Sequence, residues 1–173
     1  MKQRQTKTKT VAFLGISAAL ALLLSYVEFL LPPLFAAVPG IKLGLPNAVI
    51  LYVLFALDAR YAAGVSAVRL LVASLLFGNA MTLAYSAAGA ALSLTVMTLL
   101  KKTDRLSPVG VSVAGGVSHN LGQILVAMLL LDTPQIAYYL IVLTVTGTVS
   151  GIFIGLCGAL LVKRIPARRI LGI

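Results

Sequence analysis

The chain has few of the residues that soluble proteins place at their surfaces. Its 173 residues include four Asp and Glu residues, one His, one Cys and no Trp, and charged residues make up 10% of the sequence. Soluble domains carry about 25% charged residues, so a soluble domain of this composition would have very little polar surface. Because 60% of the residues are hydrophobic, the composition indicates an integral membrane protein.

The scarcity of Cys, His and acidic residues also limits the chemistry that we expect. A single cysteine, Cys157, excludes an internal disulfide and a multi-cysteine metal site, and the one histidine has few other candidate ligands to share a metal with. The sequence contains no Walker A motif, paired carboxylates, G-x-S-x-G motif or dinucleotide fingerprint. We therefore predict that the chain is not an enzyme, needs no metal or cofactor, and does not hydrolyse ATP itself.

Long apolar runs fill most of the sequence. After a basic tail at residues 1–10, apolar segments lie at residues 11–31, 46–57, 61–77, 81–100, 108–131 and 136–162. Backbone in lipid must satisfy its hydrogen bonds within helices or a closed barrel, and long continuous runs favour helices. We predict an all-α integral membrane protein with about six transmembrane helices in one bundle. It forms a single polytopic domain over residues 1–173, with an outer loop at residues 32–45.

The second segment is shorter than the others. A transmembrane helix needs about 20 apolar residues, and only "DAR" separates this segment from the third. The two segments are therefore either a tight hairpin or one broken span.

The Lys and Arg residues are distributed unevenly between the connecting segments. If the N-terminus is cytoplasmic, the cytoplasmic side receives Lys2, Arg4, Lys7, Lys9, Arg60, Lys101, Lys102, Arg105, Lys163, Arg164, Arg168 and Arg169. Only Lys42 falls on the outer side, and Arg69 lies within the third segment. This asymmetry follows the positive-inside rule and predicts a multi-pass cell-membrane protein with both termini cytoplasmic. The net charge of +10 then reflects contact with anionic membrane lipids and requires no nucleic-acid partner.

Small residues recur at four-residue spacing in two of the segments. Gly147, Gly151 and Gly155 form one stripe, and the first segment carries another. The second stripe consists of Ser17, Ala21 and Ser25. Such stripes let helix backbones approach closely in lipid. Packing within the chain is one interpretation, and a surface for a partner subunit is the other, for which the first segment is the better candidate.

A few polar residues interrupt the apolar segments. His119 and Gln123 are four residues apart, and Asn120 and Gln123 are three apart, so the three can share one helical face. Polar groups at membrane depth usually face a cavity or a neighbouring helix, and here they concentrate in the outer half of the predicted topology. We predict one outward-facing substrate-binding cavity. Its members are Arg69, His119, Asn120 and Gln123, with Asn79, Tyr85 and Glu28 near its mouth and Asn47 and Lys42 in a lid region.

Simpler interpretations exist for several of these residues. Arg69 and Glu28 can neutralise each other, His119 can form a hydrogen bond between helices, and Asn79 can cap the fourth helix. If the cavity exists, Arg69 and His119 favour a ligand with an anionic or acceptor-rich group.

Four stretches together resemble the Gx transporter family. They are "PGIKLGLPNAVIL", "FGNAMTLAYSAAGAALSLTVM", "GGVSHNLGQILVA" and "GTVSGIFIGLCGALLVKR", and the resemblance runs from about residue 10 to residue 164. Members of that family often carry the description heptaprenyl diphosphate synthase component I. The family is similar in size and topology to the S components of energy-coupling-factor (ECF) transporters. Those proteins capture vitamins or related micronutrients from outside, and they work with a transmembrane coupling protein and ATPases.

The resemblance implies a membrane protein that binds a small micronutrient or vitamin-like compound for uptake powered by partner ATPases. By this analogy the stripe on the first segment faces the coupling protein, although the S-component signature is Ala-x-x-x-Ala and this chain has Ser17-x-x-x-Ala21. Residues 32–45 then form a lid over the site. The alternative is a non-catalytic membrane subunit of a quinone, isoprenoid or flavin-linked assembly. A prenyl diphosphate synthase itself holds magnesium through aspartate-rich motifs, and the sequence has no aspartate cluster.

Overall fold

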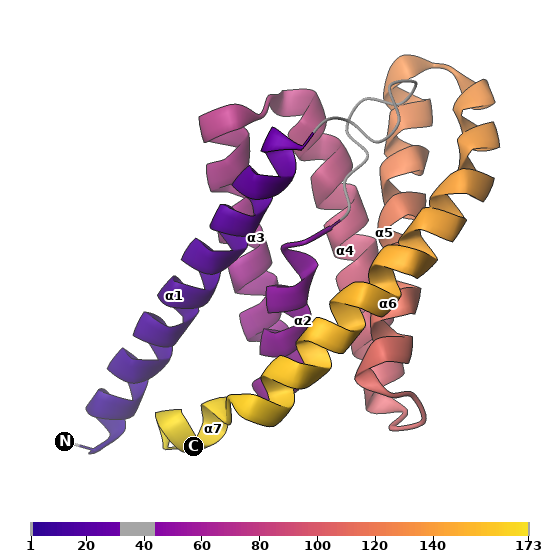
Figure 1. Cartoon of the computed structure of the whole chain (residues 1–173). Coiled ribbons are helices and arrows are strands. Elements are labelled where there is room, and N and C mark those ends of the chain that lie inside the picture. The colour runs from indigo at the N-terminus through magenta and orange to yellow at the C-terminus, as the bar shows by residue number, and fades with distance from the viewer. Residues whose placement is uncertain (1, 32–43, 173) are drawn as a thin grey trace.

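The structure, a computed structural model, describes residues 2–31 and 44–172. The elements are α1 (Lys2–Leu30), α2 (Asn47–Ala56), α3 (Ala59–Phe77), α4 (Ala80–Lys102), α5 (Pro108–Leu131), a 3₁₀ helix η1 (Pro134–Tyr139), α6 (Leu140–Arg164) and α7 (Ala167–Leu171). The long helices form one bundle, and α1 begins at the same end of it at which α7 ends (Figure 1). Within the described ranges the chain has no β-strand, which confirms the predicted all-α fold.

Five stretches among the described residues are long and apolar enough to cross a membrane. They are Gln5–Leu30 in α1, all of α3, α4 and α5, and Pro134–Arg164, which joins η1 to α6. The second predicted segment corresponds to α2, which has 10 residues and is therefore about 15 Å long. That length is half of the roughly 30 Å hydrocarbon core. The chain is thus a multi-pass membrane protein in which α2 is a separate helix too short to span.

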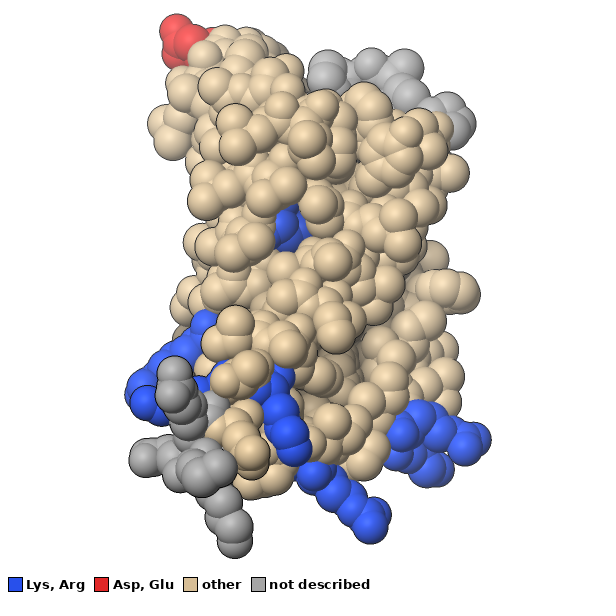
Figure 2. All heavy atoms as spheres, turned by 90° about the vertical axis from the view of Figure 1, so that its left-hand side faces the viewer, with Lys and Arg blue, Asp and Glu red and all other residues tan. Residues whose placement is uncertain are grey.

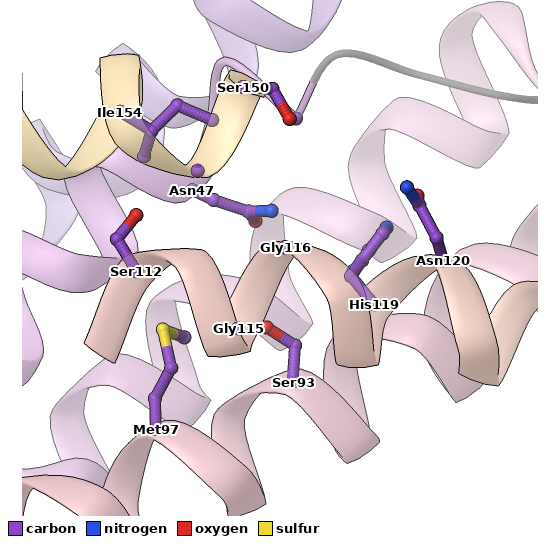
Figure 3. Close-up of a pocket in the computed structure, with 12 residues that line it drawn as sticks. Asn47, Ser93, Met97, Ser112, Gly115, Gly116, His119, Asn120, Ser150 and Ile154 are labelled. Atoms are coloured by element: carbon purple, nitrogen blue, oxygen red, sulfur yellow. The ribbon is translucent and has the colours of Figure 1, made fainter. Parts of the chain in front are cut away.

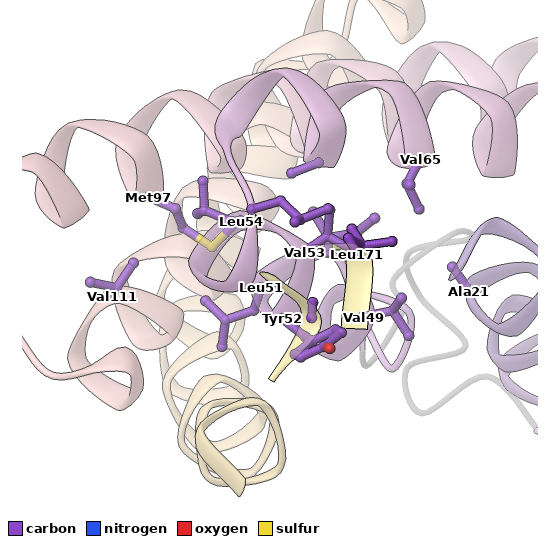
Figure 4. Close-up of a cluster of buried hydrophobic side chains, with 14 residues drawn as sticks. Ala21, Val49, Leu51, Tyr52, Val53, Leu54, Val65, Met97, Val111 and Leu171 are labelled. Atoms are coloured by element: carbon purple, nitrogen blue, oxygen red, sulfur yellow. The ribbon is translucent and has the colours of Figure 1, made fainter. Parts of the chain in front are cut away.

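The short helix α2 is enclosed by the other helices. Residues 49–54 are all buried, and a helix that is apolar on every side belongs in the interior of a bundle. Side chains from most of the other helices surround it (Figure 4). These include Ala21 of α1, Val65 of α3, Met97 of α4, Val111 of α5 and Leu171 of α7. The buried apolar core of the described residues is therefore built around a helix that is too short to cross the membrane.

Two cations hold the C-terminal end of α2. Lys101 Nζ donates a hydrogen bond to the Leu54 carbonyl at 2.6 Å. Arg168 donates from Nε to the Ala56 carbonyl at 3.2 Å and from Nη2 to the Leu57 carbonyl at 3.4 Å. The last carbonyl groups of a helix have no partner within the helix, and positive charge at that end is favourable. The end of α2 is thereby connected to the end of α4 and to α7.

Helices α4, α5 and α6 pack backbone against backbone. A Cβ atom placed on Gly116 of α5 would lie 2.5 Å from the Gly147 carbonyl oxygen of α6. A Cβ atom on Gly122 of α5 would lie 2.8 Å from the Ala88 carbonyl oxygen of α4. Real Cβ atoms cannot approach so closely, so only glycine permits this separation of the helices.

The predicted glycine stripe of α6 lies in this contact. A Cβ atom on Gly151 would lie 2.7 Å from Val113 Cα, and one on Gly155 would lie 2.7 Å from Val109 Cα. Gly147, Gly151 and Gly155 therefore serve packing within the chain, which was the simpler of the two interpretations.

The predicted partner surface on α1 requires a correction. Ser17, Ala21 and Ser25 are 6%, 0% and 3% exposed, because this face of α1 packs against α3 and α2. The stripe is interior surface of the chain itself and is not available to another subunit. The small side chains bring α1 close to its own neighbours, as small residues do between membrane helices.

The charged side chains separate along the long axis of the bundle. Figure 2 shows Lys and Arg gathered at the lower end, where α1, α3 and α7 have termini in Figure 1, below a broad band of uncharged surface. One small basic area appears at mid-height within that band. The uncharged band matches a surface that faces lipid, and the basic end matches a surface that faces water and lipid head groups.

Candidate functional site

A polar pocket lies where the start of α2 meets α4, α5 and α6. It is lined by Gly44, Asn47, Ser93, Met97, Ser112, Gly115, Gly116, His119, Asn120, Ser150, Gly151 and Ile154 (Figure 3). Because α2 occupies only the lower half of the bundle (Figure 1), its first residue, Asn47, reaches this pocket from within the membrane-spanning region. The pocket thus combines side-chain amide, hydroxyl and imidazole groups at a depth where water is scarce.

The pocket is narrow in this structure. Its cavity volume is about 10 Å³, whereas pockets that hold small organic ligands usually measure about 300–1,000 Å³. A volume near 10 Å³ admits about one water molecule. The residues are therefore assembled, but the cavity in this conformation is too small for a larger ligand.

The three polar residues predicted on the fifth helix are all buried, but they face two neighbours. A Cβ atom on Gly89 of α4 would lie 2.8 Å from Gln123 Cγ and 3.1 Å from His119 Cε1. His119 and Gln123 therefore pack against α4. Asn120 instead donates from Nδ2 to the Leu143 carbonyl of α6 at 2.8 Å. The structure confirms that His119 and Gln123 share a face and places Asn120 between α5 and α6.

Arg69 belongs to a second polar cluster, outside the lining of the pocket. It lies midway along α3, is 6% exposed, and its Nη1 makes a long contact of 3.5 Å with Ser25 Oγ of α1. Glu28 of α1, also buried, acts electrostatically on Arg69. The mutual neutralisation of Arg69 and Glu28 stays a prediction, since Glu28 acts on Arg69 only through its charge. Two buried donors of Arg69, Nε and Nη2, have no acceptor within residues 2–31 and 44–172.

Glu28 connects the two clusters. Its carboxylate Oε1 accepts a hydrogen bond from the Gly44 backbone N–H, and Gly44 lines the pocket. Gly44 has a φ of +79°, a left-handed conformation that favours glycine, and its carbonyl accepts from the Asn47 N–H at 2.8 Å. This turn leads the chain into α2. The clusters around Arg69 and His119 are therefore linked through Glu28 and the turn at residues 44–47.

Asn79 acts as a helix cap. Its Oδ1 accepts from the Thr82 N–H at 2.8 Å, and Thr82 Oγ1 accepts from the Asn79 N–H at 2.9 Å, which forms a capping box at the start of α4. The side chain is exposed and does not line the polar pocket. The simpler interpretation of Asn79 is the one that the structure supports.

Loss of this cap is expected to destabilise the protein moderately. Asn79→Ala removes the acceptor for the Thr82 N–H, and such substitutions lower the free energy of unfolding by about 1 kcal/mol. Thermal unfolding of the purified protein in detergent measures the effect. Asn79→Asp keeps the acceptor and should unfold close to the wild type, whereas equal stability of the alanine variant would contradict the capping role.

The remaining predicted residues have different positions. Asn47 lines the pocket, and Tyr85 of α4 is buried without belonging to the pocket lining. Lys42 lies outside the described residues, as does most of the predicted lid at residues 32–45.

Sequence reasoning missed several residues of the pocket. Gly44, Ser93, Ser112 and Ser150 line it, and none was among the predicted site residues. For Ser112 a signal was present, because Ser112, Gly116 and His119 have the spacing of one helical face. Serine was overlooked because a single hydroxyl in an apolar helix can bond to its own backbone and so does not by itself indicate a cavity.

The described residues contain no group of three or more His, Cys, Asp or Glu side chains that could hold a metal ion. The buried polar groups of the described residues are amides, hydroxyls, one imidazole, one guanidinium and one carboxylate. Such groups recognise a ligand through hydrogen bonds and charge.

The comparison with protein families matches residues 17–161 to a family model described as heptaprenyl diphosphate synthase component I. The matched range includes α2 to α5, the C-terminal half of α1, most of α6, the pocket and Arg69. The match confirms the family that the four sequence stretches indicated, and the word component in its description suggests a subunit of a larger assembly. No curated protein and no solved structure matches the chain significantly.

Proposed function

We propose that this chain, which belongs to the heptaprenyl diphosphate synthase component I family, is a membrane subunit that binds a small ligand with an anionic or acceptor-rich group. Arg69 is the observation that carries the proposal. Its guanidinium is buried midway along a membrane-spanning helix, and two of its nitrogen donors have no acceptor among the described residues. An ionised side chain at this depth is costly and usually marks a ligand or ion site. Carboxylate and phosphate groups match the donor geometry of a guanidinium best.

The pocket beside the start of α2 supplies the second half of the proposed site. Asn47, His119 and Asn120 line it, and Gln123 lies one turn further along α5. Gln123 Nε2 is a buried donor for which the described chain provides no acceptor. A ligand that accepts hydrogen bonds from Gln123 and Arg69 would satisfy groups that are otherwise left unpaired in lipid. We infer that ligand binding opens the narrow pocket by displacing the turn at residues 44–47.

The direction of capture follows from the basic end of the bundle. Under the positive-inside rule that end faces the cytoplasm, so the N-terminus is cytoplasmic and the proposed ligand arrives from the opposite side. The ligand class in this proposal is a micronutrient or vitamin-like compound, as for the S components that the family resembles. The sequence contains no Walker A motif, so the energy for uptake would come from partner ATPases acting through a coupling membrane protein.

Substitution of Arg69 tests the proposal. We expect the wild-type protein, purified in a mild detergent and analysed by native mass spectrometry, to retain a small molecule. Arg69→Met keeps the length of the side chain and removes its charge and donors, so retention should fall at least tenfold. Val68→Met is the matched control, because Val68 is the preceding residue and is 51% exposed on the lipid-facing surface.

Two results would contradict the proposal. One is a wild-type protein that retains no small molecule, and the other is a folded Arg69→Met variant that retains as much as the control. If Arg69→Met does not fold, Arg69→Lys provides the test. Lysine keeps the charge and loses the planar donor geometry, so Arg69→Lys should retain the ligand more weakly than the wild type. Equal retention by Arg69→Lys and the wild type would also count against the proposal.

A second candidate function rests on the description of the family. That description names a component of a prenyl diphosphate synthase, and the chain could be a non-catalytic membrane subunit of an isoprenoid, quinone or flavin-linked assembly. Affinity purification from the native membrane separates the candidates. Co-purification of a coupling membrane protein with ATPases supports uptake, whereas co-purification of a prenyl synthase or redox subunit without ATPases supports the second candidate.

A further inference from the structure

Many hydroxyl groups in the long helices bond to the backbone of their own helix. Ser17 Oγ donates to the Phe13 carbonyl at 2.9 Å, and Ser118 Oγ donates to the Ala114 carbonyl at 2.7 Å. Serine and threonine in apolar helices commonly satisfy their donors in this way. A hydroxyl with such a bond needs no partner outside its own helix.

Two serines that line the polar pocket lack this bond. Ser93 of α4 and Ser112 of α5 are 3% and 4% exposed, and neither hydroxyl makes a hydrogen bond to a group in residues 2–31 and 44–172. The side-chain amide of Asn47, at the start of α2, also lines the pocket and has no hydrogen bond within the same ranges. Buried polar groups in proteins are nearly always bonded to protein or to ordered water. These three groups therefore indicate an occupant of the pocket.

The three groups approach the pocket from three different helices. Ser112 and His119 differ in direction by about 20° around α5, since each residue turns a helix by about 100°. Figure 3 shows both side chains pointing to the side of α5 on which Asn47 lies. A Cβ atom on Gly115 of α5 would lie 3.2 Å from Ser93 Oγ, so the hydroxyl from α4 also lies against this part of α5.

The cavity has room for one water molecule. Its volume of about 10 Å³ is close to the smallest volume that holds a water, and an internal water usually makes about three hydrogen bonds. Two hydroxyls and one side-chain amide can supply that number. Because a hydroxyl can both donate and accept, these groups can pair with the hydrogens and with the lone pairs of one water.

An ion fits this cavity less well than water does. Of the residues that line the pocket in the described chain, none is Lys, Arg, Asp or Glu, and an ion buried without a counter-charge is costly. A cation would also face the positive end of α2. An anion would face the Glu28 carboxylate, which accepts a hydrogen bond from the Gly44 N–H at the edge of the pocket. The lining therefore favours an uncharged occupant.

We propose that the polar pocket is a subsite for one uncharged oxygen atom, which Ser93, Ser112 and Asn47 hold as a water molecule in this conformation. The water joins the start of α2 to α4 and α5. In one respect this inference rests on the proposed function. A ligand that opens the pocket must replace the hydrogen bonds of the water, so the part of the ligand that enters is a hydroxyl, carbonyl or amide group. Its anionic group lies at Arg69.

A double-mutant cycle tests whether the two hydroxyls share one water. Thermal unfolding is measured for the full-length protein in detergent, after washing that native mass spectrometry shows to have removed any retained small molecule. Ser93→Ala and Ser112→Ala should each unfold about 2–4 °C below the wild type, because the remaining groups keep an incomplete set of hydrogen bonds. The double variant should unfold close to the less stable single variant, since it removes both hydroxyls together.

Ser118→Ala is the matched control for this cycle. Ser118 is a half-buried serine of α5 that bonds to its own helix and does not line the pocket. When it is combined with Ser93→Ala, the two shifts of the unfolding midpoint should add. If the shifts of Ser93→Ala and Ser112→Ala also add, the hydroxyls share no occupant and the inference is wrong.

Two measurements identify the occupant directly. A structure of the washed protein that resolves ordered water should show density within hydrogen-bond distance of Ser93 Oγ and Ser112 Oγ, and a pocket without density overturns the inference. Unfolding in sodium chloride and in choline chloride tests for a cation, because choline is too large for the cavity. Equal midpoints support water. Higher stability in sodium chloride for the wild type, but not for Ser112→Ala, would identify a monovalent cation and overturn the inference.

The failure of this inference differs from the failure of the proposed function. Additive shifts or an empty pocket, together with ligand retention that depends on Arg69, exclude the water site and leave the proposed function standing. Retention that does not depend on Arg69 contradicts the proposed function. In that case the density and the coupling between Ser93 and Ser112 still decide whether the pocket holds a water.

Discussion

Gly155→Leu is expected to separate α5 from α6 and to destabilise the whole bundle. A Cβ atom at this position would lie 2.7 Å from Val109 Cα and 2.9 Å from Ser112 Cβ. Backbone and Cβ atoms of a packed helix cannot rotate away, so the helices must move apart along their common surface. Overpacking of an interior usually costs about 1–3 kcal/mol and sometimes more. We expect the free energy of unfolding to fall by an amount near the upper end of this range, because Gly147 and Gly151 would lose their contacts with α5 as well.

The measurement is thermal unfolding in detergent. A loss of about 3 kcal/mol lowers the unfolding midpoint of a protein of this size by about 6–12 °C. Gly15→Leu is the matched control, because a Cβ atom on Gly15 of α1 meets no atom within 4 Å. That variant should unfold at or above the wild-type temperature, since glycine is a poor helix former. If both variants unfold together near the wild type, the close packing of α5 and α6 does not hold this bundle together.

Glu28→Gln is expected to lower the free energy of unfolding at least as much as Gly155→Leu does, because it leaves the buried charge of Arg69 uncompensated. Glutamine keeps an oxygen that can accept from the Gly44 N–H, so the substitution removes mainly the negative charge. A buried charge that is left without its counter-charge usually destabilises a protein by about 3–5 kcal/mol. Both side chains are less than a tenth exposed, so water provides little compensation.

The double variant Glu28→Gln with Arg69→Met provides the decisive comparison. If the cost comes from an uncompensated guanidinium, removing that guanidinium should restore most of the lost stability. Replacing a buried pair with apolar groups is often neutral or stabilising. Strictly additive losses in the double variant would contradict the electrostatic coupling of Glu28 and Arg69. A ligand with an anionic group should stabilise Glu28→Gln more than the wild type, because it replaces the missing charge.

The long helices could be predicted from the sequence because lipid imposes a simple rule on it. Apolar runs such as 81–100 and 108–131 correspond to α4 and α5 within a few residues. The position of α2 was not predictable in the same way. Its residues are as apolar as those of a span, and composition does not distinguish a helix surrounded by lipid from one surrounded by protein.

The candidate site was predictable only in part, since Asn47, His119 and Asn120 are the predicted residues that line the pocket. Buried polar residues such as Arg69 and His119 stand out in an apolar sequence, because placing them in lipid is costly. Their division into two clusters depends on the rotation of each helix, which no local pattern specifies. For the same reason the stripe at Ser17 and Ala21 was wrongly assigned to a partner subunit. Its spacing indicates close packing but does not identify the helix that packs there.

The attachment of α2 at both ends has a mechanical consequence. Its N-terminal turn, with Gly44 and Asn47, borders the polar pocket, and its final carbonyl groups are bonded to Lys101 and Arg168. A helix of this length moves along its axis as a rigid body, because its backbone hydrogen bonds resist compression. A shift that widens the pocket therefore also pulls on α7 at the basic end of the bundle. Widening of the polar pocket and displacement of α7 should therefore occur together, because both depend on the position of α2.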